Sequence, residues 1–174
     1  MKTIGRERAF QQLRDLKTEF RSELKSFEAN AESCGTCDTP GACCLDAHFV
    51  NVRITRIEAE AIARELSALS TIKRAAVEAR IDDSIERFGL RDGTGNTYAC
   101  PLYERNSGCL VHDARVKPLP CMHHACYEKR EDLPPDSLLE NAELQAAVID
   151  RRTYGKPTVL TPLPLAVRAA MKRY

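Results

Sequence analysis

Apolar and charged positions alternate with a helical period over the first thirty residues. Apolar residues recur every three or four positions, and Arg, Lys and Glu occupy the positions between them. This spacing predicts a long amphipathic helix within residues 1–32. We expect its apolar face to pack onto the rest of the domain, although near-heptad spacing leaves a weak dimer seam as a second hypothesis. The face consists of Phe10, Leu13, Leu16, Phe20, Leu24 and Phe27.

Alternation with a period of two over residues 48–54 predicts a short strand or extended segment. Thr55 and Glu58 then have the spacing of a capping box, in which each side chain accepts a backbone N–H at the start of a helix. Helices are predicted over about 56–69 and about 71–88, the second ended by Gly89. The predicted apolar face of the second helix is Ile72, Ala76, Ile81, Ile85 and Phe88.

The remaining pattern divides into a turn-rich middle and a helical end. Residues 89–135 contain repeated Gly and Pro positions, which exclude a long helix. Asp136 is predicted to cap a helix over 137–152, and Pro162 to introduce a short final helix, so residues 136–174 form the C-terminal helices. We therefore expect one mainly α domain over 1–174, with helices wrapped around a loop-rich centre and at most a short strand.

Charge and hydropathy narrow the function classes. The chain has 26 basic and 25 acidic residues, a net charge of +1, which argues against nucleic acid or an anionic membrane as a partner. It has no signal-peptide pattern and no apolar run long enough to span a membrane. We expect a cytoplasmic protein, and in that reducing compartment clustered cysteines indicate metal binding or catalysis instead of disulfides.

All eight cysteines lie in two segments within residues 34–126, and both segments are rich in turn residues. Such segments bury little apolar surface, so another source of order is needed. A thiolate-bound structural zinc contributes about 10–16 kcal/mol, which becomes folding free energy. We therefore predict a metal-binding region whose candidate ligands are among Cys34, Cys37, Cys43, Cys44, Cys100, Cys109, Cys121 and Cys126.

The first segment contains a C-x-x-C pair and two adjacent cysteines. Cys34 and Cys37 have the spacing of a metal knuckle, and they follow a predicted helix, whereas a thioredoxin-like redox pair would follow a strand. Cys43 and Cys44 are neighbours, and neighbouring side chains in an extended segment point to opposite sides. We expect one of them to ligate and the other to pack or to serve a second centre.

The second segment spaces its cysteines too widely for a local knuckle, at intervals of nine, twelve and five residues. Closing a site must therefore bring several loops together, and one composite centre shared with the first segment is the economical hypothesis. Three histidines of this segment are either further ligands or ordinary loop residues: His112, His123 and His124. Basic residues that could offset thiolate charge are Arg105, Arg115, Lys117, Lys129 and Arg130.

The order of these motifs resembles a known family. A C-x-x-C, a CC pair, C-P-L, G-C-L-V-H-D-A-R and P-x-P-C follow one another as in the YkgJ-type cysteine-cluster proteins, described as zinc- or iron-chelating. The resemblance covers about residues 34–126 and implies all eight cysteines as ligands. Five residues separate Cys37 from the CC pair where the family usually has three, and the common R-P dipeptide is replaced by Arg115-Val116-Lys117-Pro118. A related motif accompanies an iron–sulfur cluster in flagellin lysine methylases.

Three functional hypotheses follow. The first is a metal-binding accessory or chelating module that holds an iron–sulfur cluster, such as [4Fe–4S], or zinc; four thiolates serve either, and the methylases favour iron–sulfur slightly. The second is a metal- or cluster-dependent enzyme with a methylase-like, protein-modifying activity, although the sequence shows no acid–base pair or glycine-rich cofactor loop. The third is a zinc-stabilised domain that binds an unidentified protein partner.

Overall fold

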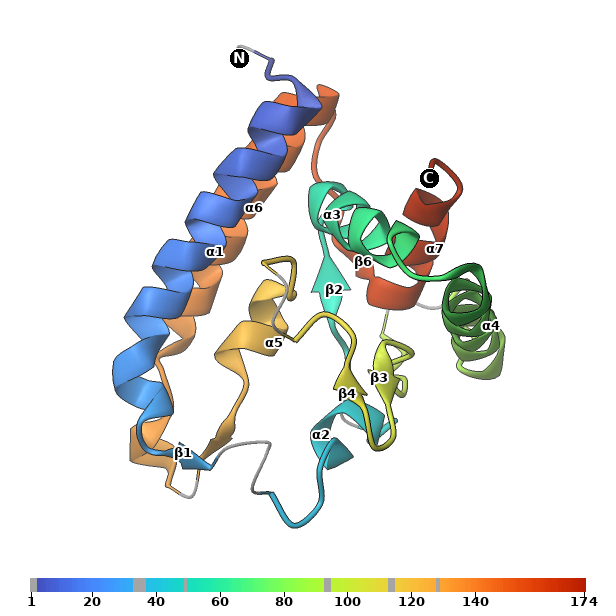
Figure 1. The fold of residues 1–174 in the computed structure, drawn as a ribbon. Helices are drawn as coiled ribbons and strands as arrows, with labels where there is room; N and C mark the ends of the chain where they lie inside the picture. The colour runs from blue at the N-terminus through green and yellow to red at the C-terminus, as the bar shows by residue number, and fades with distance from the viewer. Residues whose placement is uncertain (1–2, 33–36, 49, 93–94, 113–114, 128) are drawn as a thin grey trace.

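The fold is mainly helical, as the sequence pattern predicts. A computed structural model describes residues 3–32, 37–48, 50–92, 95–112, 115–127 and 129–174 (Figure 1). The described residues are 57% helical, and their strands occur as two-stranded antiparallel pairs. The helices are α1 (Arg6–Glu28), α2 (Ala42–Leu45), α3 (Arg56–Ser67), α4 (Thr71–Arg87), α5 (Leu119–His123), α6 (Asp136–Tyr154) and α7 (Leu163–Met171), with a 3₁₀ turn at Arg130–Asp132.

Three short strand pairs tie distant segments together. Strand β1 (Ala31–Glu32) pairs with β5 (Cys126–Tyr127), and β2 (Arg53–Ile54) pairs with β6 (Thr161–Pro162). Strand β3 (Tyr103–Glu104) pairs with β4 (Gly108–Cys109) in a hairpin. In the described part of the extended segment predicted over 48–54, the strand β2 forms at the end that leads into α3.

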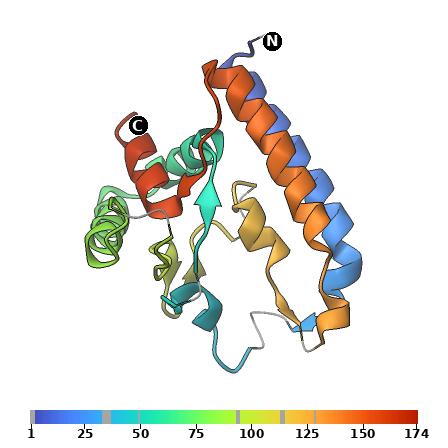
Figure 2. The same cartoon turned by 180° about the vertical axis from the view of Figure 1, so that it is seen from behind.

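Helices α1 and α6 lie side by side along one edge of the molecule (Figures 1 and 2). The apolar face of α1 packs within the chain, against α6, α3 and α5, which confirms the first of the two packing hypotheses. Phe27 at the end of this face is only half-buried. The face also buries Lys17, whose side chain is 3% exposed and which the pattern alone assigned to the polar side.

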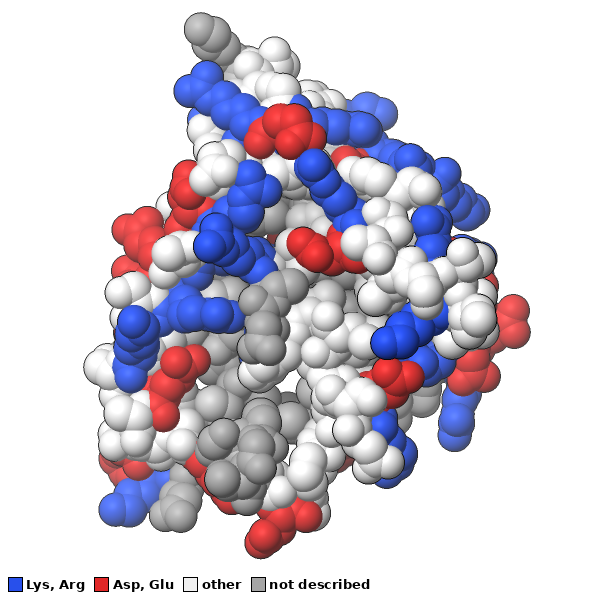
Figure 3. All heavy atoms as spheres, viewed as in Figure 1, with Lys and Arg blue, Asp and Glu red and all other residues white. Residues whose placement is uncertain are grey.

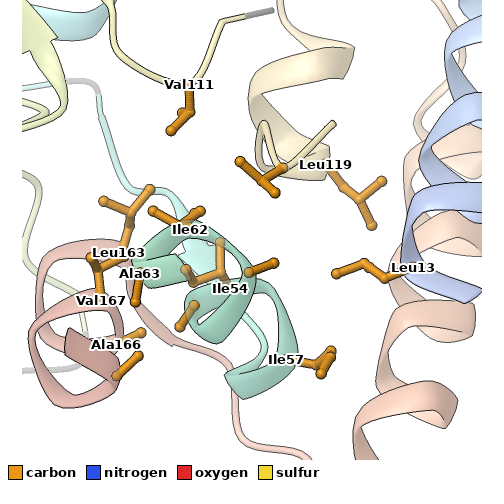
Figure 4. Packing of buried hydrophobic residues seen from close by; sticks show 14 of the residues in the cluster. Leu13, Ile54, Ile57, Ile62, Ala63, Val111, Leu119, Leu163, Ala166 and Val167 are labelled. Carbon is orange, nitrogen blue, oxygen red and sulfur yellow. The ribbon is translucent and has the colours of Figure 1, made fainter. Parts of the chain in front are cut away.

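Helices α1 and α6 form one layer of the core, and α3, α4 and α7 form the other. Figure 4 shows Ile54, Ile62, Leu163 and Val167 converging between α3 and α7, with Leu119 of α5 pointing toward α1. These side chains belong to a hydrophobic cluster that also includes residues of α1 and α6. The core thus connects both helical layers through α3 and α5.

The predicted start of α3 is confirmed, and the predicted face of α4 is correct at Ile81 and Ile85 but wrong at Ile72 and Ala76. The Thr55 side chain accepts from the Glu58 N–H, and the Glu58 carboxylate accepts from the Thr55 N–H, which completes the capping box. In α4, Ile72 is 84% exposed and Ala76 is also exposed. Ile72 is nine positions before the buried Ile81, and at 3.6 residues per turn it projects about 180° away. The buried face is instead Val77, Ile81, Ser84 and Ile85.

Asp136 is not the cap of α6. Pro135 occupies that position and makes no side-chain cap, and Asp136 is the first helical residue. Its carboxylate in the first turn still interacts favourably with the helix dipole. Among the described helices, none combines the length and the apolar character needed to cross a membrane.

Candidate metal centre

Helix α2 carries the adjacent cysteines, and a close contact determines its position. Gly41 precedes α2 in the left-handed region, at φ +80°, and a Cβ there would lie 1.9 Å from the Tyr103 ring. The first cysteine segment therefore packs directly on the β3–β4 hairpin. Because Cys43 and Cys44 lie in a helical turn, the expectation that they occupy extended backbone is wrong.

Cys100 is held beside α2 by backbone hydrogen bonds. Its N–H donates to the Cys44 carbonyl over 2.8 Å, and the Tyr98 N–H donates to the Val50 carbonyl over 2.9 Å. Tyr98 is fully buried, and its hydroxyl donates to the Val52 carbonyl. These bonds anchor residues 98–100 against the chain that leads from α2 to β2.

The β3–β4 hairpin places Cys109 near the same point. Cys109 pairs across the hairpin with Tyr103, whose N–H donates to the Cys100 carbonyl over 3.3 Å. Asn106 at φ +67° and Gly108 at φ +86° form the tight turn between the strands. Positive φ favours Gly and tolerates Asn, which explains these residue types.

A buried ion pair positions helix α5 and its Cys121. Lys17 Nζ lies 3.1 Å from Glu58 Oε1, and both side chains are 3% exposed. The Lys17 ammonium also donates to the carbonyls of Val116 and Lys117, over 3.3 and 2.7 Å. The Leu119 N–H at the start of α5 donates to Glu58 Oε1 over 3.4 Å. Helices α1 and α3 thereby both fix the position of the start of α5.

Five cysteines interact with one another electrostatically. Burial raises the pKa of Cys44 first, and negative charge on each of Cys43, Cys100, Cys109 and Cys121 raises that pKa further. Cys43, Cys44, Cys100, Cys109 and Cys121, contributed by both sequence segments, are called the thiol cluster below.

The pKa values of Cys100 and Cys121 are raised by the same two causes, burial and neighbouring cysteine charge. Burial, with the charge on Cys109 and Cys43 adding to it, raises the pKa of Cys100 to about 11. Burial and the charge on Cys100 raise the pKa of Cys121 to about 12, although Lys117 opposes this shift. Lys117 is thus the basic residue of those predicted from the sequence that acts on a cluster thiol most directly.

The remaining predicted ligands are Cys34, Cys37 and Cys126. Cys34 falls within 33–36, outside the described residues. Cys37 contacts the Thr39 hydroxyl at 3.8 Å, and Cys126 lies in β5 opposite Glu32. Within the described chain, neither is among the strongest influences on the pKa of Cys44, Cys100 or Cys121.

The three histidines differ in their surroundings. His123 stacks on Phe20 of α1, with ring centroids 6.5 Å apart, and its Nε2 is buried without a hydrogen-bond partner in the described structure. The exposed His112 donates its backbone N–H to the Cys109 carbonyl. Burial and the charges of Lys117 and His123 lower the pKa of His124. None of these contacts directs an imidazole at the thiol cluster.

The donor chemistry fits a soft metal, but the described side chains do not form a closed ligand set. Thiolates select zinc or iron–sulfur clusters over the hard cations that prefer oxygen. Within the described residues, no three His, Cys, Asp or Glu side chains are arranged to hold a metal ion. The cluster thiols are therefore neighbours that share one environment without coordination geometry.

Some residues that position the cluster were missed by sequence reasoning. Gly41, Lys17, Glu58 and Tyr98 organise the segments that carry the thiols. The sequence held one signal, because Lys17 continues the line of Leu13 and Phe20 along the apolar face of α1. Comparison of the chain with family models, with curated proteins and with solved structures finds no match.

Proposed function

We propose that this chain is a metal-binding accessory or chelating protein whose thiol cluster supplies the ligands of an iron–sulfur cluster or a zinc ion. The supporting observation is convergence: α2, residues 98–100, strand β4 and helix α5 bring five cysteines into one environment. Up to 78 residues of sequence separate them, between Cys43 and Cys121. Cysteines that only filled a core would have no reason to meet in this way.

The charge balance of a bound metal is compatible with the same proposal. Metal binding would replace the thiol protons, and a divalent metal or cluster core would balance the thiolate charge while ordering the loops. Lys117 lies close enough to lower the pKa of Cys121, so it offsets part of the residual negative charge. Outside this region, α3, α4 and α7 have an ordinary apolar core.

The resemblance to YkgJ-type proteins and flagellin lysine methylases is the reason to place iron–sulfur before zinc. A cubane cluster or a structural zinc takes four thiolates, and the thiol cluster offers five. Zinc bound here would supply structural order, whereas an iron–sulfur cluster could also exchange electrons. The enzyme hypothesis requires a metal with an open coordination position facing a pocket, and the interaction-domain hypothesis requires only closed four-ligand sites.

Anaerobic purification followed by absorption spectroscopy and elemental analysis tests the proposal. We expect stoichiometric iron and acid-labile sulfide with broad visible absorption. Colourless protein with stoichiometric zinc would select the zinc form. Protein that is folded and contains neither metal would overturn the proposal.

Cysteine variants test whether the thiol cluster is one centre. Cys44→Ser and Cys121→Ser come from different sequence segments, and each should lower the total metal content to the same low level. Ser107→Ala is a matched control, because Ser107 is exposed in the same hairpin as Cys109. Two independent centres would instead leave about half of the metal in each cysteine variant.

A further inference from the structure

A pocket lies between α3, α6 and α7, and none of its lining residues belongs to the thiol cluster. Its volume is about 360 Å³, within the range of small-ligand pockets, which begins at about 300 Å³. Its polar residues come from α3, from α6 and from the residues that follow α6 and α7. Its apolar wall comes from α7 and residues 157–159. The polar lining consists of Arg56, Glu60, Asp150, Tyr154, Lys156 and Arg173.

Positive charge is in excess around this pocket. Glu60 is fully buried, and its Oε1 accepts from Arg56 Nε over 3.4 Å and from Arg173 Nη1. Arg6 Nε lies 3.5 Å from Glu60 Oε2. Three guanidinium groups thus surround one carboxylate, which is more than its neutralisation requires. The Asp150 carboxylate is already occupied, because it accepts from the Ile57 N–H and from the Thr158 hydroxyl, each over 2.9 Å.

Arg56 is preorganised to receive an anion. Its Nε is engaged by Glu60, and its guanidinium carbon lies 3.9 Å from the centre of the Tyr154 ring, so the planar group is held on two sides. Within the described residues its two terminal NH₂ groups make no hydrogen bond. A guanidinium edge of this kind matches the two oxygens of a carboxylate.

Tyr154 adds a buried hydroxyl to the same pocket, beside the Glu60 carboxylate. Burial and the nearby Glu60 charge raise the pKa of Tyr154, so the hydroxyl stays protonated and can donate. The wall is apolar, and Val159 remains 73% exposed at the opening, where a bound apolar group would cover it.

We propose that this pocket binds a small organic anion with an apolar body. The carboxylate of the ligand interacts with Arg56, Arg173 and Lys156, and its body packs against Val159 and Leu165. The site is separate from the proposed metal centre, and each can fail without the other.

Two probes of the same size and opposite charge test this site. Full-length protein as purified is titrated with benzoate and, separately, with benzylammonium, and backbone amide NMR shifts are followed. Benzoate should give saturable shifts that concentrate on residues 154–170, and benzylammonium should bind at least about tenfold more weakly. Equal responses to both probes, or no saturable response to benzoate, would overturn the proposal.

Three variants connect the binding to the named side chains. Arg56→Gln should weaken benzoate binding by about tenfold, and Lys156→Gln, an exposed change at the opening, by several-fold. Arg21→Gln removes an exposed arginine of α1 outside the pocket and serves as the control. If Arg56→Gln does not fold, the benzoate affinity of Lys156→Gln still tests the proposed site. Benzoate affinity that stays unchanged in Lys156→Gln would contradict the assigned anion site.

Discussion

At the residue scale, Gly41 is the position where a single methyl group should disturb the proposed centre. Its φ of +80° disfavours any L side chain, and its Cβ would overlap the Tyr103 ring. We expect Gly41→Ala to lower the free energy of unfolding by about 1–3 kcal/mol in urea denaturation. Gly5→Ala is the control, because a Cβ there has nothing within 4 Å. Equal stability of the two variants would show that Tyr103 moves away without cost.

Glu143 gives a pH-dependent prediction at the same scale. Burial, followed by the charges of Glu58 and Glu140, raises the pKa of Glu143 above 4.5 in the folded state. Protonation is therefore more favourable in the folded than in the unfolded chain, and this stabilisation is complete below pH 4.5 and lost as pH rises through the folded pKa. Glu143→Gln should be more stable than the wild type at pH 7 and equally stable near pH 4, as measured by urea denaturation. A stability difference independent of pH would contradict this origin.

At the element scale, the Lys17–Glu58 pair connects α1, α3 and the start of α5. Lys17→Met leaves the Glu58 carboxylate buried without its cation, a change that typically costs about 3–5 kcal/mol. Thermal or urea unfolding should show this loss, and metal retention should fall with it because α5 carries Cys121. The exposed Arg64–Glu7 pair offers a matched control, since Arg64→Met should cost less than about 1 kcal/mol. Similar losses in both variants would mean that burial does not decide the effect.

The elements should also differ in their dependence on metal. The described part of residues 89–135 contains short helices, short strands and turns, whereas α3 and α4 bury regular apolar faces. We expect removal of the metal to abolish amide protection between Cys100 and Cys126 and to preserve it in α3 and α4. Hydrogen exchange on metal-loaded and stripped protein measures this. Unchanged protection of the middle segment would contradict a structural role for the metal.

At the scale of the whole molecule, the numbers of basic and acidic residues nearly balance. Basic and acidic side chains are interspersed over the face in Figure 3, consistent with a net charge of +1. The apolar face of α1 is covered by α6, α3 and α5. This face is therefore not free for the dimer contact considered from the sequence. We therefore expect recognition by this molecule to depend on local sites, such as the proposed metal centre and the proposed anion pocket, more than on its net charge.

Local patterning predicted the helices and one of their caps, because hydrophobic period and capping chemistry act within a few residues. Thr55 and Glu58 form their capping box without help from the rest of the chain, and prolines alone keep the middle of the chain from forming a long helix. The eight cysteines also identified the candidate chemistry through their crowding. Such features depend on neighbours in sequence, so they can be read from the sequence.

Packing between distant elements decided the rest. The contact of α1 with α3 and α5 buries Lys17, and the angle at which α4 packs on α7 leaves Ile72 in solvent. The grouping of Cys43 and Cys44 with Cys100, Cys109 and Cys121 depends on backbone bonds and ion pairs between residues 40 to 100 positions apart. No local pattern encodes such long-range contacts, because each exists only after the core has brought its partners together.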